Sequence, residues 1–240
     1  DYTQALSEGV RGLRVGVPRE YFVEGIQAGV EAAVRAAIKV FEDLGASVEE
    51  VSLPTTRHAL ACYYILALSE ASANLARYDG VKYGYSYQDT DNMWEAMEKT
   101  RQLGFGAEVK RRIMLGTYAL SSGYYDAYYL KAQKVRRLIS DDFKKAFADV
   151  DVIACPVSPE VAFQQGEKAD GVSMYQADQF TIPASLAGLP CLSMPIGFSA
   201  GLPVGLQLIG RYFDEKSILT VADQYQQQTV HHLQMPEAFS

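Results

Sequence analysis

The first part of the chain, residues 1–55, alternates between the hydrophobic spacing of strands and that of a helix. An apolar stripe is formed by Val30, Val34, Ile38, Phe41 and Leu44. Steps of three and four residues place this stripe on one side of a helix, and Gly45 follows where a left-handed C-terminal residue is favoured. Short runs at 13–17 and 48–53, each closed by a proline, predict a strand on either side. The strand–helix–strand order predicts a crossover joining parallel strands.

The middle of the chain, residues 56–148, has a helical pattern interrupted by loops. Residues 56–76 are apolar nearly all round, which predicts a helix buried among other elements. Residues 79–107 are rich in Gly, Tyr, Asp and Asn and predict a loop region with one short helix at 93–103. From residue 108 to 148 we expect two helices with a break at 121–123, because Ser and Gly are weak inside helices.

The last part, residues 149–240, returns to alternating strands and helices. The run 152–155, ended by Pro156, is typical of a strand covered on both faces. An irregular loop is expected over 158–177, then a short helix opened by Pro183 and ended by Gly188. Strands at 192–196 and 204–209 predict a hairpin, and 217–228 predicts a final helix. The whole pattern predicts an α/β fold.

Composition and charge exclude several classes of protein. Hydrophobic residues make up 48% and charged residues 21%, which is too apolar for a disordered chain. The net charge of -7 argues against a module that neutralises many phosphates. We expect neither a membrane span nor a signal peptide, and the first residues read as the middle of a longer chain. Three scattered cysteines favour a reducing, cytoplasmic setting over a disulfide framework.

Common catalytic and metal-binding motifs are missing from the sequence. There is no GxSxG, Walker, GxGxxG or HExxH motif, and the three histidines offer no metal-like spacing. We therefore expect no metal site and no Ser–His–Asp triad. Ser121-Ser122-Gly123 could expose a nucleophilic hydroxyl, but the same residues explain a helix break without chemistry, and we favour the latter.

Two charged positions allow a binding interpretation beside an ordinary one. Lys110-Arg111-Arg112 opens a helix, so one of these side chains can turn inward, where a guanidinium requires a carboxylate. A solvated basic patch also explains the run. From the residues alone, this interpretation is favoured over an arginine that turns inward. Asp178 precedes a helix start and is either a cap or a carboxylate that receives an ammonium group. The 16 tyrosines suit a half-polar pocket, although core packing explains most of them.

Several longer stretches resemble the amidase-signature family, and in particular its A subunits of tRNA-dependent amidotransferases. The matching stretches include 13–20, 69–75, 77–80, 108–129, 186–190 and 201–207. The resemblance implies a mixed β-sheet covered by helices on both faces. By the same resemblance, this chain corresponds only to the C-terminal portion of one such domain, with a helical insertion at 56–148. Ser185, Cys191 and Ala200 depart from the family pattern without removing a substrate contact.

The resemblance also implies roles for individual residues. The lysine and two serines that hydrolyse the amide lie upstream of the matched region, so no catalytic residue is expected here. Three substrate-binding positions are present. Tyr63 corresponds to a residue beside the amide end of glutamine, Arg112 to the arginine that grips the α-carboxylate, and Asp178 to the acid that holds the α-ammonium. Such opposite charges suit a zwitterionic amino acid.

The implied partners follow from the same resemblance. Ammonia from glutamine would pass to a B subunit, which uses ATP and Mg to amidate Glu-tRNA(Gln) or Asp-tRNA(Asn), while a small C subunit holds the pair together. No cofactor is expected in this chain, tRNA would be held through the B subunit, and the missing N-terminal half would complete the protein. Without that half we expect marginal solubility and no activity. Two alternatives stay open, an amidase acting on another amide and a non-catalytic scaffold or binding chain.

Overall fold

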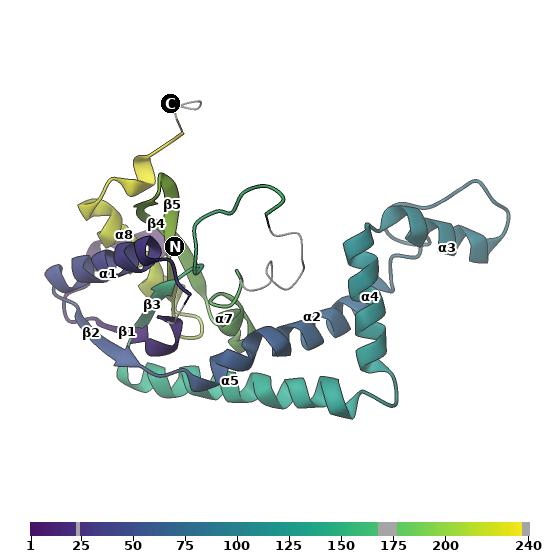
Figure 1. Cartoon of the computed structure of the whole chain (residues 1–240), viewed down its shortest axis with the longest axis horizontal. Coiled ribbons are helices and arrows are strands. Elements are labelled where there is room, and N and C mark those ends of the chain that lie inside the picture. The colour runs from purple at the N-terminus through teal and green to yellow at the C-terminus, as the bar shows by residue number, and fades with distance from the viewer. Residues whose placement is uncertain (23–24, 168–176, 237–240) are drawn as a thin grey trace. The chain divides into compact units, whose positions relative to one another are not determined.

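The computed structural model describes residues 1–22, 25–167 and 177–236, and Figure 1 shows its elements. The chain divides into two compact units. The sheet unit consists of residues 1–60 and 136–240, and the helical unit of residues 61–135. The boundaries lie within two helices, α2 (Ala59–Leu75) and α5 (Lys131–Asp149).

The sheet unit contains a five-stranded mixed sheet in the order β2-β1-β3-β5-β4. Its strands are β1 (Arg14–Pro18), β2 (Ser47–Val51), β3 (Val152–Pro156), β4 (Cys191–Ser199) and β5 (Leu202–Ile209). β1 pairs in parallel with β2 and β3, while β5 runs antiparallel to β3 and β4. The predicted parallel crossover and the predicted hairpin are both confirmed. Ser199 pairs with Leu202, so the hairpin turn contains only Ala200 and Gly201, both at positive φ as a tight hairpin turn requires.

Helices cover both faces of this sheet, as the resemblance implies (Figure 1). The helices of the unit, besides its parts of α2 and α5, are α1 (Ala28–Asp43), α7 (Ile182–Ala187) and α8 (Glu215–Gln228), with shorter turns η1 (Tyr2–Glu8), η2 (Arg19–Tyr21), η3 (Pro54–His58) and η5 (His231–Leu233). α1 and α8 enclose the main hydrophobic core with the inner strands. α5 buries Ile139 and Phe143 on the other side. β3 is accordingly buried along its whole length, as predicted.

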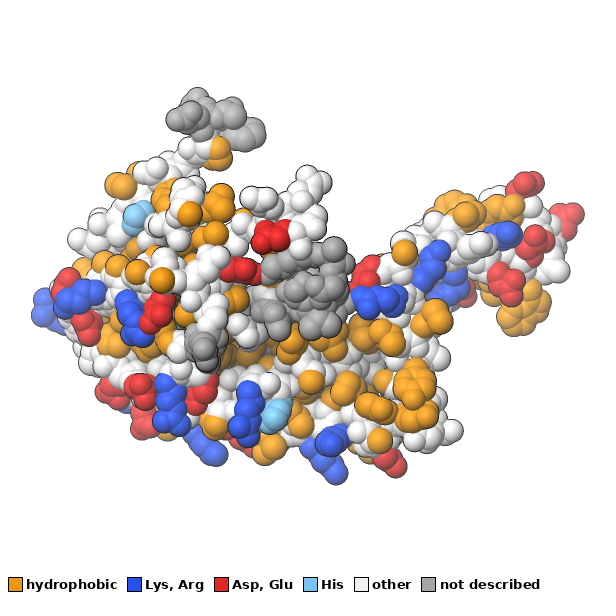
Figure 2. All heavy atoms as spheres, viewed as in Figure 1, with side chains coloured by type: hydrophobic (Ala, Val, Ile, Leu, Met, Phe, Trp, Pro, Cys, Tyr) orange, Lys and Arg blue, Asp and Glu red, His pale blue; other side chains and the backbone are white. Residues whose placement is uncertain are grey.

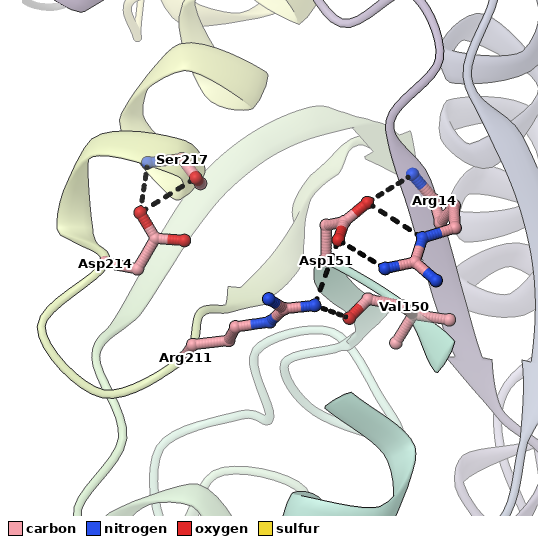
Figure 3. A network of polar contacts seen from close by, with 6 residues as sticks. All are labelled: Arg14, Val150, Asp151, Arg211, Asp214 and Ser217. Atoms are coloured by element: carbon pink, nitrogen blue, oxygen red, sulfur yellow. Dashed lines mark hydrogen bonds and ion pairs between the residues drawn. The ribbon is translucent and has the colours of Figure 1, made fainter. Parts of the chain in front are cut away.

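A charged network ties the ends of three neighbouring strands together (Figure 3). Asp151, just before β3, accepts hydrogen bonds from the Arg14 guanidinium at 2.8 and 3.1 Å and from the Arg14 backbone N–H. Arg211, just after β5, donates to the same carboxylate at 3.0 Å and to the Val150 carbonyl. The Arg14 hydrogen bond is the main cause that lowers the pKa of Asp151. The network fixes where β1, β3 and β5 begin or end.

The helical unit contains α3 (Met93–Gly104), α4 (Ala107–Leu120) and a single π-helical segment, η4 (Asp126–Leu130), beside most of α2. The predicted helix at 93–103 and the predicted break at 121–123, directly after the end of α4, are confirmed. Helices α2 and α4 approach each other closely at Gly116, where a Cβ would clash with the Leu68 carbonyl. The Ser72 and Thr117 hydroxyls lie 2.8 Å apart at the same crossing.

The predicted burial of α2 on all sides is wrong. Its buried residues are Ala59, Cys62, Leu66 and Ser69. These recur every three or four positions, so the helix packs along one side. Tyr63, Tyr64 and Ile65 are only half-buried. Apolar residues on every face of a helix therefore do not establish that every face is buried. On α2 the other faces carry side chains of intermediate exposure.

Candidate functional site

Arg112 lies on α4, where its guanidinium shares one carboxylate with its neighbour. Its Nε donates to Glu108 Oε1 at 2.8 Å, and Arg111 donates to both oxygens of Glu108 at 2.9 Å. These hydrogen bonds, first that of Arg112, lower the pKa of Glu108. The side chain of Arg112 is 39% exposed. The run at 110–112 is therefore an ordered patch in which Glu108 fixes how the planar Arg112 group is oriented.

Tyr63 lies on α2 in the same helical unit. Its ring makes an edge-to-face contact with Tyr64, with centroids 5.2 Å apart. Such an arrangement is a favoured geometry for two aromatic rings and limits their rotation. Tyr63 is half-buried, so part of the residue remains accessible.

Asp178 lies in the sheet unit, in the turn that leads into α7. Its backbone carbonyl accepts from the N–H groups of Thr181 and Ile182 at 3.2 and 3.1 Å. Its carboxylate is exposed and has no hydrogen-bond or ion-pair partner among the described residues. The capping interpretation is therefore wrong for the side chain, because the N-terminal position of α7 is taken by Thr181. The carboxylate remains available to a ligand.

The three predicted substrate-binding residues are divided between the two units. Tyr63 and Arg112 belong to the helical unit and Asp178 to the sheet unit. The hydrogen bonds, ion pairs and ring contacts given above join none of the three to another. Their common role in holding an amino acid stays a prediction from the resemblance.

The turn after Asp178 is anchored to the sheet by contacts that the sequence pattern did not reveal. Phe180 is 3% exposed, and its ring stacks on Tyr21 with centroids 5.1 Å apart. Gln207, on β5, donates through Nε2 to the Phe180 carbonyl at 3.0 Å. The one signal in the sequence was Gln207 itself, a polar residue in an otherwise apolar strand. Buried polar groups require partners, so it marked an unidentified hydrogen bond.

A cavity of about 590 Å³ opens beside this turn in the sheet unit. Its lining residues are Glu20, Tyr21, Pro54, Thr56, Arg57, Leu60, Gln179 and Phe180. The Glu20 carboxylate is already held by the Ser52 hydroxyl and the Leu53 N–H at 2.6 and 2.8 Å. The Tyr21 hydroxyl, in contrast, is buried and has no hydrogen-bond partner among the described residues. Mixed polar and apolar walls of this kind are typical of small-molecule sites.

A second groove in the sheet unit, of about 600 Å³, is a weaker candidate. It lies over α1 and β2, where basic and acidic side chains are mixed in Figure 2. Its cations are engaged locally, because Arg35 binds Glu31 at 2.7 Å and Lys39 binds Asp43 at 2.9 Å. Exposed ion pairs of this kind are ordinary features of a helix surface.

The remaining sequence candidates have structural explanations or lack partners for chemistry. The Ser121 hydroxyl donates to the Tyr118 carbonyl at 2.8 Å at the end of α4, which supports the helix-break interpretation. Within the described ranges no three His, Cys, Asp or Glu side chains gather to hold a metal ion. In the same ranges no helix has both the length and the apolarity needed to cross a bilayer. Part of the predicted loop, residues 168–176, lies outside the described residues.

Comparisons with a protein-family model and with known proteins indicate the same family. A protein-family model described as Amidase matches residues 1–219. The chain is 60% identical over 237 residues to the A subunit of Glutamyl-tRNA(Gln) amidotransferase from Chloroflexus aurantiacus, covering 98% of this chain and 48% of that protein. It is 56% identical over 240 residues to the protein of the same name from Thioalkalivibrio sulfidiphilus, covering 100% and 50%. The chain thus spans about half the length of the curated relatives it matches.

Solved structures agree with this result. The crystal structure of the A subunit of Glutamyl-tRNA(Gln) amidotransferase from Thermotoga maritima is 41% identical with a TM-score of 0.72, over 93% of this chain and 44% of that chain. A bacterial aryl acylamidase of the amidase-signature family matches at 21% identity with a TM-score of 0.69, over 95% and 46%. At that identity the similarity concerns the fold alone, so the fold is common to enzymes with different names.

Proposed function

Because the chain belongs to the amidase family, we propose that it is the C-terminal, substrate-recognising part of a glutamine-hydrolysing subunit of a tRNA-dependent amidotransferase. The observation that supports this proposal is the 60% identity, over 98% of the chain, to a protein named as the A subunit of Glutamyl-tRNA(Gln) amidotransferase. The complete subunit would cleave the C–N bond of the glutamine side-chain amide with water, giving glutamate and ammonia.

In this proposal the chain binds the amino acid and does not attack it. The Asp178 carboxylate would accept the α-ammonium group, since it has no other partner among the described residues. The Arg112 guanidinium, oriented by Glu108, would hold the α-carboxylate. Tyr63 would lie beside the side-chain amide. The lysine and two serines that perform the cleavage would come from the N-terminal half of the same subunit.

The proposed partners consume the ammonia. The B subunit would activate the carboxyl group of Glu-tRNA(Gln) or Asp-tRNA(Asn) with ATP and Mg and then amidate it, and the C subunit would complete a heterotrimer. The net charge of -7 favours an arrangement in which the B subunit holds the tRNA. The three cysteines form no disulfide among the described residues, which is compatible with the proposed location in the cytoplasm, where thiols stay reduced.

The test is to measure ammonia release from glutamine in two samples. One contains this 240-residue chain alone, and the other contains it co-expressed with the N-terminal half of the Chloroflexus aurantiacus relative. We expect ammonia only from the second sample. Ammonia from purified chain alone, or none from an assembled and folded pair, would contradict the proposal.

A second experiment distinguishes glutamine from another amide substrate. Replacing either charged contact, in Arg112→Met or Asp178→Asn, should raise the KM for glutamine roughly 10- to 100-fold, because hydrogen bonds to charged groups contribute about 1.5–3 kcal/mol. Arg111→Met is the matched control, since Arg111 binds the same Glu108. An amidase acting on an amide without an amino-acid head group would tolerate all three changes equally.

A further inference from the structure

Tyr21 is a buried residue of the sheet unit, and the proposed function makes no use of its hydroxyl. It ends η2, directly after β1, and is only 2% exposed. Its hydroxyl has no hydrogen-bond partner among the described residues. Leaving such a group unpaired costs free energy comparable to a lost hydrogen bond. The unpaired hydroxyl therefore destabilises the folded protein unless it forms a hydrogen bond in the functioning protein.

The surroundings of Tyr21 indicate what that partner is. Its ring stacks on Phe180, two residues after Asp178, and both residues line the 590 Å³ cavity. The Phe180 carbonyl is in turn fixed by Gln207. Tyr21, the cavity and the start of α7 are thus held together within one unit, so a molecule whose ammonium group binds Asp178 would lie close to this cavity.

The chemistry of the cavity favours an oxygen-bearing ligand. Arg57 supplies a cation on its wall and Gln179 a neutral amide. Burial raises the pKa of the Tyr21 phenol well above its usual range, so the hydroxyl keeps its proton and can donate a hydrogen bond. A carboxylate or an amide carbonyl accepts such a bond.

We propose that Tyr21 is a further substrate-contacting residue, whose hydroxyl donates a hydrogen bond to a carboxylate or amide oxygen of the amino acid bound at Asp178. This inference rests on the proposed function and adds a specificity contact to it. The bond supplies the partner that the hydroxyl lacks among the described residues. It therefore favours ligands that carry an oxygen at that point over isosteres that lack one.

The experiment is Tyr21→Phe in the assembled pair that hydrolyses glutamine. The substitution keeps the ring and its stack on Phe180 and removes only the hydroxyl. We expect the KM for glutamine to rise about 5-fold, since a neutral hydrogen bond contributes about 1 kcal/mol. The kcat should change little, because the contact is made in the bound substrate and in the transition state alike. The melting temperature should not fall, since no protein hydrogen bond among the described residues is lost.

Tyr225→Phe is the matched control. Tyr225 is also 2% exposed, but its hydroxyl donates to the Ile196 carbonyl at 3.5 Å within the core beneath α1 and α8. We expect this variant to melt at a lower temperature with an unchanged KM.

The possible results separate the two proposals. An unchanged KM in Tyr21→Phe, with an active wild-type assembly, would overturn the inference and leave the proposed function standing. A lowered melting temperature together with an unchanged KM would overturn it as well, because the hydroxyl would then serve the fold. No ammonia from the folded wild-type assembly would overturn both.

Discussion

The two units of the chain are stabilised in different ways. The sheet unit buries a continuous core between its strands, α1 and α8, with large side chains such as Phe41, Leu206 and Tyr225 almost fully enclosed. The helical unit encloses few residues. Instead its exposed surface carries many large hydrophobic side chains, among them Trp94 at 76% and Met114 at 72% exposure, and Figure 2 shows such side chains gathered over α2 and α4.

The helical unit is held together by close backbone contact and by individual hydrogen bonds. Gly116 lets α4 approach the backbone of α2, and the Tyr129 hydroxyl donates to Glu70 at 2.8 Å. The rings of Tyr118, Tyr124 and Tyr128 lie 4.4 to 6.4 Å apart and form a half-exposed cluster. A unit with a large core distributes its stability over many contacts, whereas a thin unit depends on a few. Point substitutions can test this difference.

The largest effect is expected from Gly116→Ala. The new Cβ would overlap the Leu68 carbonyl, which belongs to helical backbone and cannot move aside alone. Overpacking typically costs about 1–3 kcal/mol, and contact with rigid helical backbone puts this substitution at the upper end. Hydrogen exchange should show amides of α2 and α4 losing protection, while those of α1 keep it. Gly123→Ala is the control, since no atom lies within 4 Å of the position that its Cβ would take. Equal protection in both variants would show that the helices do not depend on this contact.

A smaller effect is expected from Asp151→Asn in the sheet unit. The change removes the charge shared by Arg14 and Arg211 and should lower the free energy of unfolding by about 2 kcal/mol in urea titrations. Asp149→Asn is the control, since Asp149 is exposed and has no ion pair among the described residues. A variant as stable as the control would mean that the network adds nothing to the sheet.

The same variant has a pH dependence with a definite sign. The pKa of Asp151 is lowered in the folded protein, mainly by the Arg14 hydrogen bond, from an ordinary value of 3.8. Its stabilising effect is therefore fully present above about pH 4 and lost as the pH falls through the folded-state pKa. The difference in stability between the wild type and Asp151→Asn should be constant near neutral pH and shrink below pH 3.8.

The smallest effect is expected from Tyr129→Phe in the helical unit. Its hydroxyl bonds Glu70 and Gln133 at a half-buried position beside solvent, so the loss should be about 0.5 kcal/mol. A double-mutant cycle with Glu70→Gln measures the coupling directly. A coupling energy larger than the loss of stability measured for Asp151→Asn would reverse the order expected for these two substitutions.

The sequence predicted those parts of the fold whose signals are local. α1, the hairpin of β4 and β5, and the break after α4 follow from periodicity, turn residues and weak helix formers near the element itself. The order of the strands was not predictable in this way, because the position of β5 between β3 and β4 depends on pairing between distant segments. The one-sided packing of α2 likewise depends on what covers it.

The residues of the candidate site were harder to predict from the sequence than the fold. Arg112 and Asp178 could be recognised only as charges with two possible explanations, and the resemblance to a family selected between them. Tyr21 gave no signal, because a tyrosine after a strand is ordinary and only the structure shows that its hydroxyl lacks a partner among the described residues. Gln207 gave a partial signal, because a polar residue in an apolar strand requires a hydrogen-bond partner but does not identify that partner.

The pairing of β1 with β3 also has a consequence for the time at which the protein can fold. Arg14 and Asp151, which join these strands, are 137 positions apart. Ribosomes add about 5–20 residues per second, so the first strand waits on the order of 10 s for its neighbour. During that interval β1 can pair only with β2, and the whole helical unit leaves the ribosome before the sheet is joined through its centre. The nascent chain thus carries an unpaired strand edge while these 137 residues are added, and it is in this period that a chaperone would be of most use to it.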